Sequence, residues 1–187
     1  PPTKLDRTSA FDKIGVHVAT FSGLVADLAV RLVDHLRRLT AEIDELAAEI
    51  TSRTTMLAPS LLAIPGCAAL TAAKIIGETA GIDRFRSKDS FARHNGTAPL
   101  PVWSSNHARH RLSRTGNRQL NAAIHRIALT QVRCYEDARI LMARRKANGD
   151  GGMEALRVLK PRLSGVVFRA MVADQSSLMD LAARQRS

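Results

Sequence analysis

The chain has 187 residues, of which 45% are hydrophobic and 4% aromatic, and its formal net charge is +11. This composition suits one packed domain with an extension, in which Ala, Leu and Ile do most of the packing. No apolar run reaches membrane-spanning length, and two isolated cysteines exclude a disulfide scaffold, so we expect a reducing, cytoplasmic compartment and no membrane partner.

The positive charge is distributed unevenly. Residues 1–54 hold seven Lys and Arg against eight Asp and Glu, whereas residues 55–187 hold 21 against nine. A basic region of this kind favours a polyanionic partner. Arginine predominates among the cations, which suits bidentate phosphate contacts, although a GC-rich genome produces the same bias. We therefore expect the anion-binding surface after residue 54.

Two segments are expected before the basic region. Residues 1–13 are mostly polar and open with two prolines, which predicts a disordered N-terminal segment. Residues 14–56 carry apolar side chains at heptad spacing, which predicts a long coiled-coil helix. A long helix packed on its own domain is the alternative to self-association or pairing with another helix. The apolar rows are Val25, Leu32, Leu39 and Leu46, and Ala29, Leu36, Ile43 and Ile50.

Residues 61–81 resemble a helix-hairpin-helix motif. Pro65 and Gly66 form the expected turn between two apolar helical segments, and the second helix is expected to begin at about Ala69. In such a motif the backbone N–H groups of the turn face a nucleic-acid phosphate without reading sequence. Ala68 stands where the motif usually has a second glycine, and a turn that binds no ligand is the alternative.

Residues 57–187 as a whole are predicted to form a compact helical domain. No segment shows sustained period-two alternation, so the predicted fold class is all-α. Pro161 is expected to split the last helical region, and Ser87 is expected to be an N-cap. The predicted helices are 87–94, 117–133, 136–147 and 153–183, and residues 95–115 are predicted to be a loop. His94 and His125 have no second ligand at metal spacing and are expected to be structural or to contact backbone.

The predicted loop carries the strongest chemical signal. It places Ser104 and Ser105 within residues 91–135, which contain seven arginines, four histidines and no carboxylate. A serine hydroxyl attacks only when its proton is removed, and phosphoryl transfer depends on neutralising the phosphate oxygens. On composition alone, binding of a nucleic-acid backbone is the more common use of such a loop. The side chains expected to clamp a phosphate or move a proton are Arg109, Arg111, Arg114, His107 and His110.

Several motifs in a fixed order carry a family resemblance over roughly residues 60–175. They resemble the C-terminal domain of the bridge-RNA-guided insertion-sequence transposases of the IS-one-ten type, and the preceding long helix fits the coiled-coil linker of that family. The motifs are IPG, TAAKIIGE, DRF, SFARHNGTAP, VWSSN, RHRLSRTGNRQLNAAIHRIALTQ and EALRVLK.

The resemblance implies DNA transposition by site-specific recombination. In that family a serine of the C-terminal domain attacks a DNA strand and forms a covalent phosphoserine link. Aligned through residues 110–112, the nucleophile falls on Ser104, and Ser105 stands at a family glycine, which leaves Ser105 as the second candidate. The same placement puts a group of polar side chains on the DNA or RNA backbone: Arg109, His110, Arg111, Arg114, Asn117 and Arg118.

The resemblance also implies what lies outside this chain. We expect no metal or other cofactor here, and Mg²⁺ in an N-terminal RuvC-like domain that supplies the metal-binding carboxylates. The fragment alone is therefore expected to be inactive. The expected partners are DNA, a guide RNA and a second copy through the coiled coil, at the bacterial nucleoid. The alternatives are a non-catalytic helix-hairpin-helix DNA-binding module that dimerises through the coiled coil, and a structural adaptor whose charge is incidental.

Overall fold

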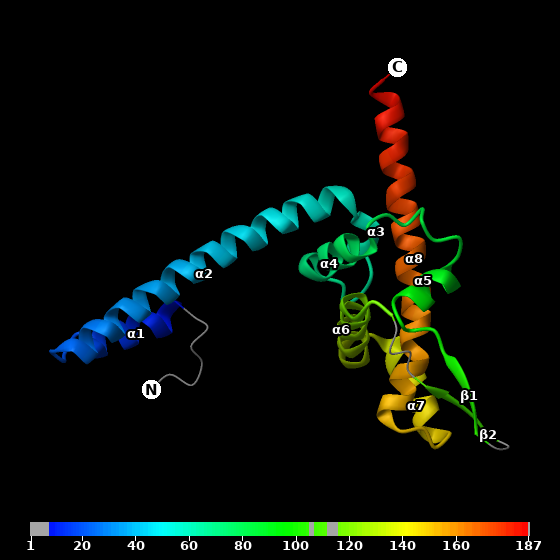
Figure 1. Ribbon diagram of the computed structural model, residues 1–187, viewed down its shortest axis with the longest axis horizontal. Coiled ribbons are helices and arrows are strands. Elements are labelled where there is room, and N and C mark those ends of the chain that lie inside the picture. The colour runs from blue at the N-terminus through cyan, green and yellow to red at the C-terminus, as the bar shows by residue number, and fades with distance from the viewer. Residues whose placement is uncertain (1–7, 105–106, 112–115, 187) are drawn as a thin grey trace. The chain divides into compact units, whose positions relative to one another are not determined.

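The computed structural model describes residues 8–104, 107–111 and 116–186 (Figure 1). The chain divides after Glu49 into two compact units, earlier than the predicted boundary at residue 57. Helices dominate the described residues, which confirms the all-α class. One two-stranded hairpin is the exception.

The first unit contains helix α1 (Thr8–Val18) and most of helix α2 (Leu24–Leu57). The prediction of one continuous helix over 14–56 is wrong at residues 19–23, where the chain turns and Gly23 adopts a φ of +101°. Helix α1 begins inside the predicted disordered segment 1–13, so that prediction is wrong for residues 8–13. Residues 1–7 lie outside the described chain. A left-handed glycine explains the break, because other residues adopt this backbone conformation only at a cost.

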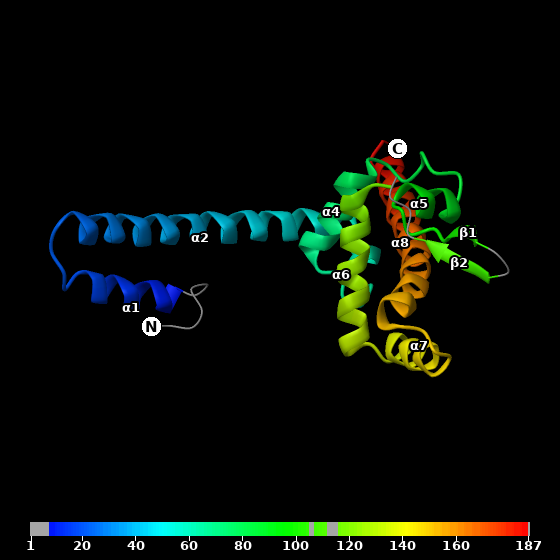
Figure 2. The same ribbon diagram turned by 60° about the horizontal axis from the view of Figure 1, so that its bottom comes forward.

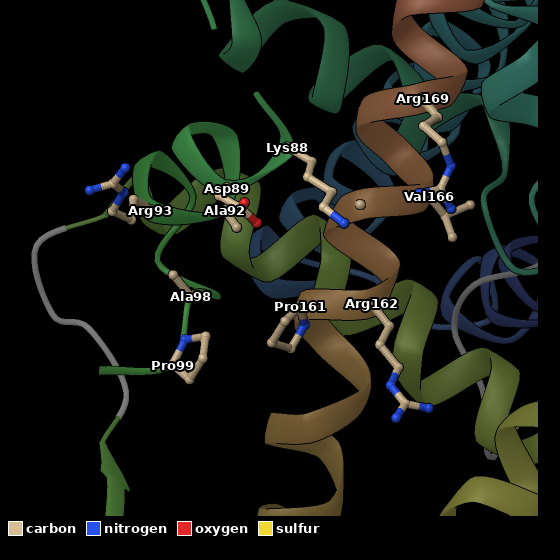
Figure 3. Close-up of a pocket in the computed structure, with 11 residues that line it drawn as sticks. Lys88, Asp89, Ala92, Arg93, Ala98, Pro99, Pro161, Arg162, Val166 and Arg169 are labelled. Carbon is tan, nitrogen blue, oxygen red and sulfur yellow. The ribbon is translucent and has the colours of Figure 1, made fainter. Parts of the chain in front are cut away.

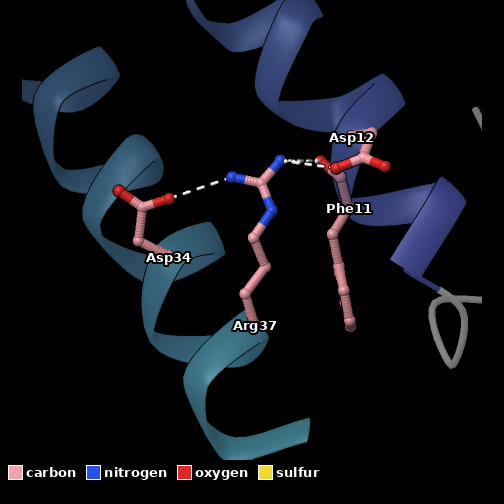
Figure 4. A network of polar contacts seen from close by, with 4 residues as sticks. All are labelled: Phe11, Asp12, Asp34 and Arg37. Atoms are coloured by element: carbon pink, nitrogen blue, oxygen red, sulfur yellow. Dashed lines mark hydrogen bonds and ion pairs between the residues drawn. The ribbon is translucent and has the colours of Figure 1, made fainter. Parts of the chain in front are cut away.

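Helix α1 lies alongside part of α2 (Figure 2). Arg37 of α2 joins the two helices, because its Nη2 atom lies 3.0 Å from Asp12 Oδ1 and 3.3 Å from the Phe11 carbonyl oxygen (Figure 4). Its Nη1 atom lies 3.0 Å from Asp34 Oδ1 on the same helix. Most residues of the heptad rows are exposed, as Val25 at 82% and Leu32 at 64% show, whereas Ala29 and Ile50 are half-buried.

Helix α8 (Gly152–Arg184) is the central element of the second unit (Figure 1). It contacts α3 (Pro59–Leu62), α5 (Lys88–His94), α6 (Arg118–Cys134) and α7 (Glu136–Ala147), while α4 (Ala69–Thr79) packs on α6. These helices share one apolar core, and its most deeply buried large side chains are Leu61, Ile75, Phe91, Leu120, Ile124, Ile127 and Val167.

Most of the predicted helices of this unit are confirmed. Helix α7 has the predicted bounds, and Ser87 caps α5, since its Oγ atom accepts a hydrogen bond from Ser90 N at 3.2 Å. The predicted split at Pro161 is wrong, because α8 continues through it. Proline removes a helical hydrogen bond, and burial of Leu159 and Leu163 on either side offsets this loss.

Two buried polar contacts tie α8 to distant segments. The Asp174 carboxylate accepts hydrogen bonds from Ser60 N at 2.8 Å and Leu61 N at 3.3 Å, which satisfies N–H groups of the short helix α3. Asn95 donates from Nδ2 to Ser164 Oγ at 2.7 Å. These bonds fix the ends of α3 and α5 against α8.

The predicted loop over 95–115 is wrong for residues 100–104 and 107–111, which form strands β1 (Leu100–Ser104) and β2 (His107–Arg111). The strands pair antiparallel, with Leu100 opposite Arg111 and Ser104 opposite His107. Backbone pairing creates this hairpin without the alternation of apolar residues that usually predicts a strand, since the sequences LPVWS and HARHR contain none.

Candidate nucleic-acid interface

The root of the hairpin is fixed by a buried asparagine and two closely packed glycines. Asn95 is fully buried, and its Oδ1 atom accepts hydrogen bonds from Thr97 N at 3.0 Å and Thr97 Oγ1 at 2.7 Å. A Cβ atom on Gly116 would lie 2.3 Å from Gly96 N, so no other residue fits there. The Asn117 N–H donates to the His94 carbonyl oxygen at 2.6 Å. The two ends of the hairpin segment therefore leave the core at one point.

The hairpin carries several of the predicted site residues. Ser104 ends β1, while Arg109, His110 and Arg111 lie in β2; their backbone is described and their side chains are not. The second serine candidate, Ser105, and the predicted phosphate contact Arg114 lie outside the described residues.

The register decides which backbone positions share a face of the hairpin. Ser104 pairs with His107 and Val102 pairs with Arg109. Because alternate positions of a strand fall on the same face, positions 104, 107, 109 and 111 belong to one face of the ladder. His110, opposite Pro101, belongs to the other face. One face of the backbone ladder therefore combines a serine, a histidine and two arginines.

Two predicted contacts, Asn117 and Arg118, lie at the start of α6 and differ in their surroundings. Asn117 is the N-cap: its Oδ1 atom accepts from Gln119 N at 2.9 Å and Leu120 N at 3.0 Å, and its Nδ2 atom donates to Glu78 Oε2 at 2.9 Å. The structure thus gives its side chain a role in the fold. Arg118, the next residue, is exposed and available to an anion.

The Pro65–Gly66 turn connects α3 to α4, and α4 begins at Ala69 as predicted. Pro65 accepts a hydrogen bond at its carbonyl oxygen from Gln131 Nε2 at 2.7 Å. Gly66 has a φ of +84°, and a Cβ atom there would lie 3.0 Å from Thr130 Cβ, so close packing on α6 explains the glycine without a ligand. The predicted phosphate contact at this turn stays a prediction.

Two exposed arginines that the sequence analysis did not single out lie beside this turn. Arg126 and Arg133 of α6 line a concavity of about 690 Å³ together with Pro65, Gly66 and Ala68. Their spacing of seven residues places both on one face of the helix, which is the sequence signal that marks them. The turn and these cations form a surface suited to a phosphate backbone.

A basic groove of about 730 Å³ lies between α5 and α8 (Figure 3). Its single carboxylate, Asp89, stands against four cations. Gly165 lies in its lining, where a Cβ atom would meet Arg169 Nη1 at 3.8 Å and Lys88 Cδ at 3.9 Å. No sequence pattern marks this groove, because its residues come from separate helices. The cations are Lys88, Arg93, Arg162 and Arg169.

Burial explains the shifted pKa values of two titratable side chains of this unit, Cys67 and His94. Burial raises the pKa of the Cys67 thiol to about 11, which disfavours the reactive thiolate. Burial, with the charge of Arg84, lowers the pKa of His94, whose ring lies 5.0 Å from that of Phe85. Within the described ranges no three His, Cys, Asp or Glu side chains converge as metal ligands.

No helix among the residues that the structure describes is long and apolar enough to cross a membrane. Residues 58–142 match the transposase IS116/IS110/IS902 family. The matched stretch contains the Pro65–Gly66 turn and both strands of the hairpin, and it supports a role in transposition or recombination. A comparison with curated proteins gives no match.

Proposed function

We propose that the second unit is the serine-bearing part of a transposase, which holds a nucleic-acid backbone and supplies the hydroxyl that attacks a DNA strand. The hairpin carries this proposal. It places Ser104, His107 and Arg109 at positions of one ladder face, within the stretch that matches the transposase family. A nucleophile, a proton acceptor and a phosphate clamp are the parts that a phosphoryl transfer needs.

The proposed reaction exchanges one phosphodiester for another. The Ser104 Oγ atom attacks phosphorus while His107 accepts its proton, and the bond between phosphorus and the sugar oxygen breaks. The freed sugar oxygen takes up a proton, and the DNA stays joined to the serine as a phosphodiester. Arg109 and Arg111 neutralise the phosphate oxygens. Attack by the hydroxyl of a partner strand reverses these steps and restores the serine, and Ser105 is the second candidate for the same role.

The metal-binding carboxylates that this reaction needs are proposed to belong to another domain. We propose that a RuvC-like domain holds Mg²⁺, which would stabilise charge on the leaving oxygen when bound. The residues described here contribute the hydroxyl and the cations around the phosphate. A guide RNA is the proposed second nucleic acid, since the surface of this unit offers several separate basic concavities.

We further propose that α2 pairs with a second copy of the chain. Its heptad rows include exposed residues along the helix, such as Val25, Leu32 and Ile43. Burying a leucine or valine side chain of this kind stabilises an assembly by about 1.5–3 kcal/mol. Since these residues stay exposed beside α1, a partner helix can pack on them.

The second candidate function is a DNA-binding module that performs no chemistry. The Pro65–Gly66 turn with Arg126 and Arg133 favours it, because backbone N–H groups and arginines hold phosphates without a nucleophile. This candidate predicts salt-sensitive binding that survives loss of both serines.

Formation of a covalent protein–DNA adduct separates the two candidates. The chain is combined with the domain that carries the metal-binding carboxylates, guide RNA and target DNA, and adducts that resist denaturant are counted. Ser104→Ala should lower the adduct at least about tenfold, and the Ser104→Ala, Ser105→Ala pair should abolish it. Ser176→Ala, an exposed serine bonded to its own helix, should leave it unchanged. An adduct that persists in the double variant would refute the catalytic proposal.

A further inference from the structure

A third cavity, of about 340 Å³, lies at the root of the hairpin. Gly96 and Gly116, the two ends of the hairpin segment, form part of its wall. Among the described residues, its lining contains no carboxylate, although it brings together basic side chains from α6 and α8. These are Arg118, His125, Arg157 and Lys160.

Lys160 distinguishes this cavity from the exposed grooves. It is only 6% exposed, and its Nζ atom donates to Asn121 Oδ1. The Nδ2 atom of Asn121 donates to the Asn95 carbonyl oxygen at 2.9 Å, so the amide oxygen is held toward the lysine. Within the described part of the chain, Lys160 forms no ion pair.

Burial of the Lys160 ammonium group in this position destabilises the folded state. Lysine is almost never fully buried unless a charged partner compensates for its lost hydration. A neutral amide oxygen satisfies one of its three donors and supplies no charge. Burial lowers the pKa of Lys160, which reports the same cost, and its charge contributes to the lowered pKa of His125. The cavity therefore has the electrostatics of an anion site whose anion comes from another molecule.

The lining of the cavity and its location at the root of the hairpin indicate what kind of anion it binds. Met153 and Leu156 add apolar surface beside the cations, which suits a sugar next to a phosphate. Leu100 and Ser104 lie at opposite ends of β1, roughly 13 Å apart for an extended strand. An anion at the root is therefore a flanking phosphate, distinct from the one that Ser104 would attack.

We infer that this cavity binds a phosphodiester of a nucleic-acid strand, with Lys160 as its buried cation and Arg118 and Arg157 at its mouth. The inference rests on the proposed function for the class of ligand, and it assigns a site that lies partly outside the family-matched stretch. Lys160 is a binding residue here, remote from the reacting atoms.

Binding of labelled oligonucleotides to the full chain tests the site. Fluorescence anisotropy is measured with single-stranded DNA, duplex DNA and single-stranded RNA over a range of salt concentrations. Lys160→Met, which removes the ammonium group and keeps an unbranched side chain only one atom shorter, should weaken binding of at least one strand type about tenfold and reduce the salt slope by about one. Lys146→Met, an exposed lysine of α7, makes the same charge change outside the cavity and should alter affinity less than about twofold.

Thermal unfolding of the same variants separates a binding role from a structural one. A lysine kept for binding predicts that Lys160→Met retains or raises Tm while it loses affinity, because methionine relieves the cost of burial. Unchanged affinity and salt slope would overturn the inference. If Lys160→Met does not fold, the exposed pair Arg118→Gln and Arg157→Gln should reduce the slope by about two, and an unchanged slope would overturn the inference equally.

The outcome is independent of the serine chemistry. A Lys160 effect without any covalent adduct would retain the site and refute the catalytic proposal. An adduct together with no Lys160 effect would support the catalytic proposal and refute the cavity as a binding site. The strand type that loses the most affinity identifies the phosphate as one of DNA or of RNA.

Discussion

Helices α2 and α8 are nearly equal in length, with 34 and 33 residues, and they use their side chains in opposite ways. Helix α2 leaves its apolar heptad rows exposed, whereas α8 buries Leu159, Leu163 and Val167 in the core of its own unit. The cations of α8 line a groove and a cavity, whereas Arg37 of α2 is paired with Asp12 and Asp34.

The two helices differ in where their apolar faces pack, and this difference determines which side chains each helix leaves for binding. A helix gains most of its stability from packing. Helix α8 obtains this packing within the chain, so its remaining face is available for cations. Helix α2 obtains only part of it from α1, and its exposed rows are the basis of the proposed pairing with a second copy.

The largest effect is expected when substitutions in α2 block its proposed pairing with a second copy of the chain. Leu32→Asn with Leu39→Asn should convert the proposed dimer into a monomer of 20.4 kDa, because two polar amides would be buried in adjacent heptads of one apolar row. Sedimentation velocity measures the mass. Leu181→Asn, an exposed leucine near the end of α8, should leave the dimer intact. A wild-type chain that sediments as a monomer would refute the role assigned to α2.

A smaller effect is expected where α8 is tied to its own unit. Asp174→Ala removes the acceptor for Ser60 N and Leu61 N and should lower the free energy of unfolding by about 2–3 kcal/mol. Asp180→Ala, on the exposed end of the same helix, should change it by less than about 0.5 kcal/mol. Urea denaturation compares the two, and equal losses would show that the buried carboxylate is not special.

One glycine in each helical region sharpens the contrast further. Gly23→Ala should destabilise the turn before α2 by about 1–2 kcal/mol, since its φ of +101° is strained for alanine although nothing lies within 4 Å. Gly165→Ala should stabilise α8 by about 0.5–1 kcal/mol, because the added methyl group makes only ordinary contacts. Differential denaturation gives both signs, and a destabilised Gly165→Ala would mean that the groove floor tolerates no side chain.

The smallest effect concerns the pKa of His125, which burial lowers first and the charge of Lys160 lowers further. Lys160→Met should raise this pKa partway toward 6.5, as NMR of the imidazole ring can measure. A folded-state pKa below the unfolded one means that stability falls as pH falls below the unfolded value, so the variant should lose less stability there. The pKa of His94, lowered by burial and Arg84, should stay unchanged. A parallel shift of both would implicate a global change instead.

The sequence predicts those features that depend on local chemistry. Ser87 as an N-cap, the start of α4 at Ala69 and the bounds of α7 follow from capping residues and breakers. The hairpin escaped prediction because its pairing is a matter of backbone register. The Lys160 cavity escaped because it exists only where residues 96, 116, 118 and 160 meet, and the sequence pattern of α8 marks Lys160 as one cation among several.

The most direct test of the central claim is to locate the DNA on the protein. The covalent adduct formed with the metal-binding domain, guide RNA and target DNA is digested with protease and nuclease, and the peptide that keeps a nucleotide is sequenced by mass spectrometry. We expect a phosphodiester on Ser104, the last residue of β1. A nucleotide on Tyr135, on any residue outside the hairpin, or on no residue at all would contradict it.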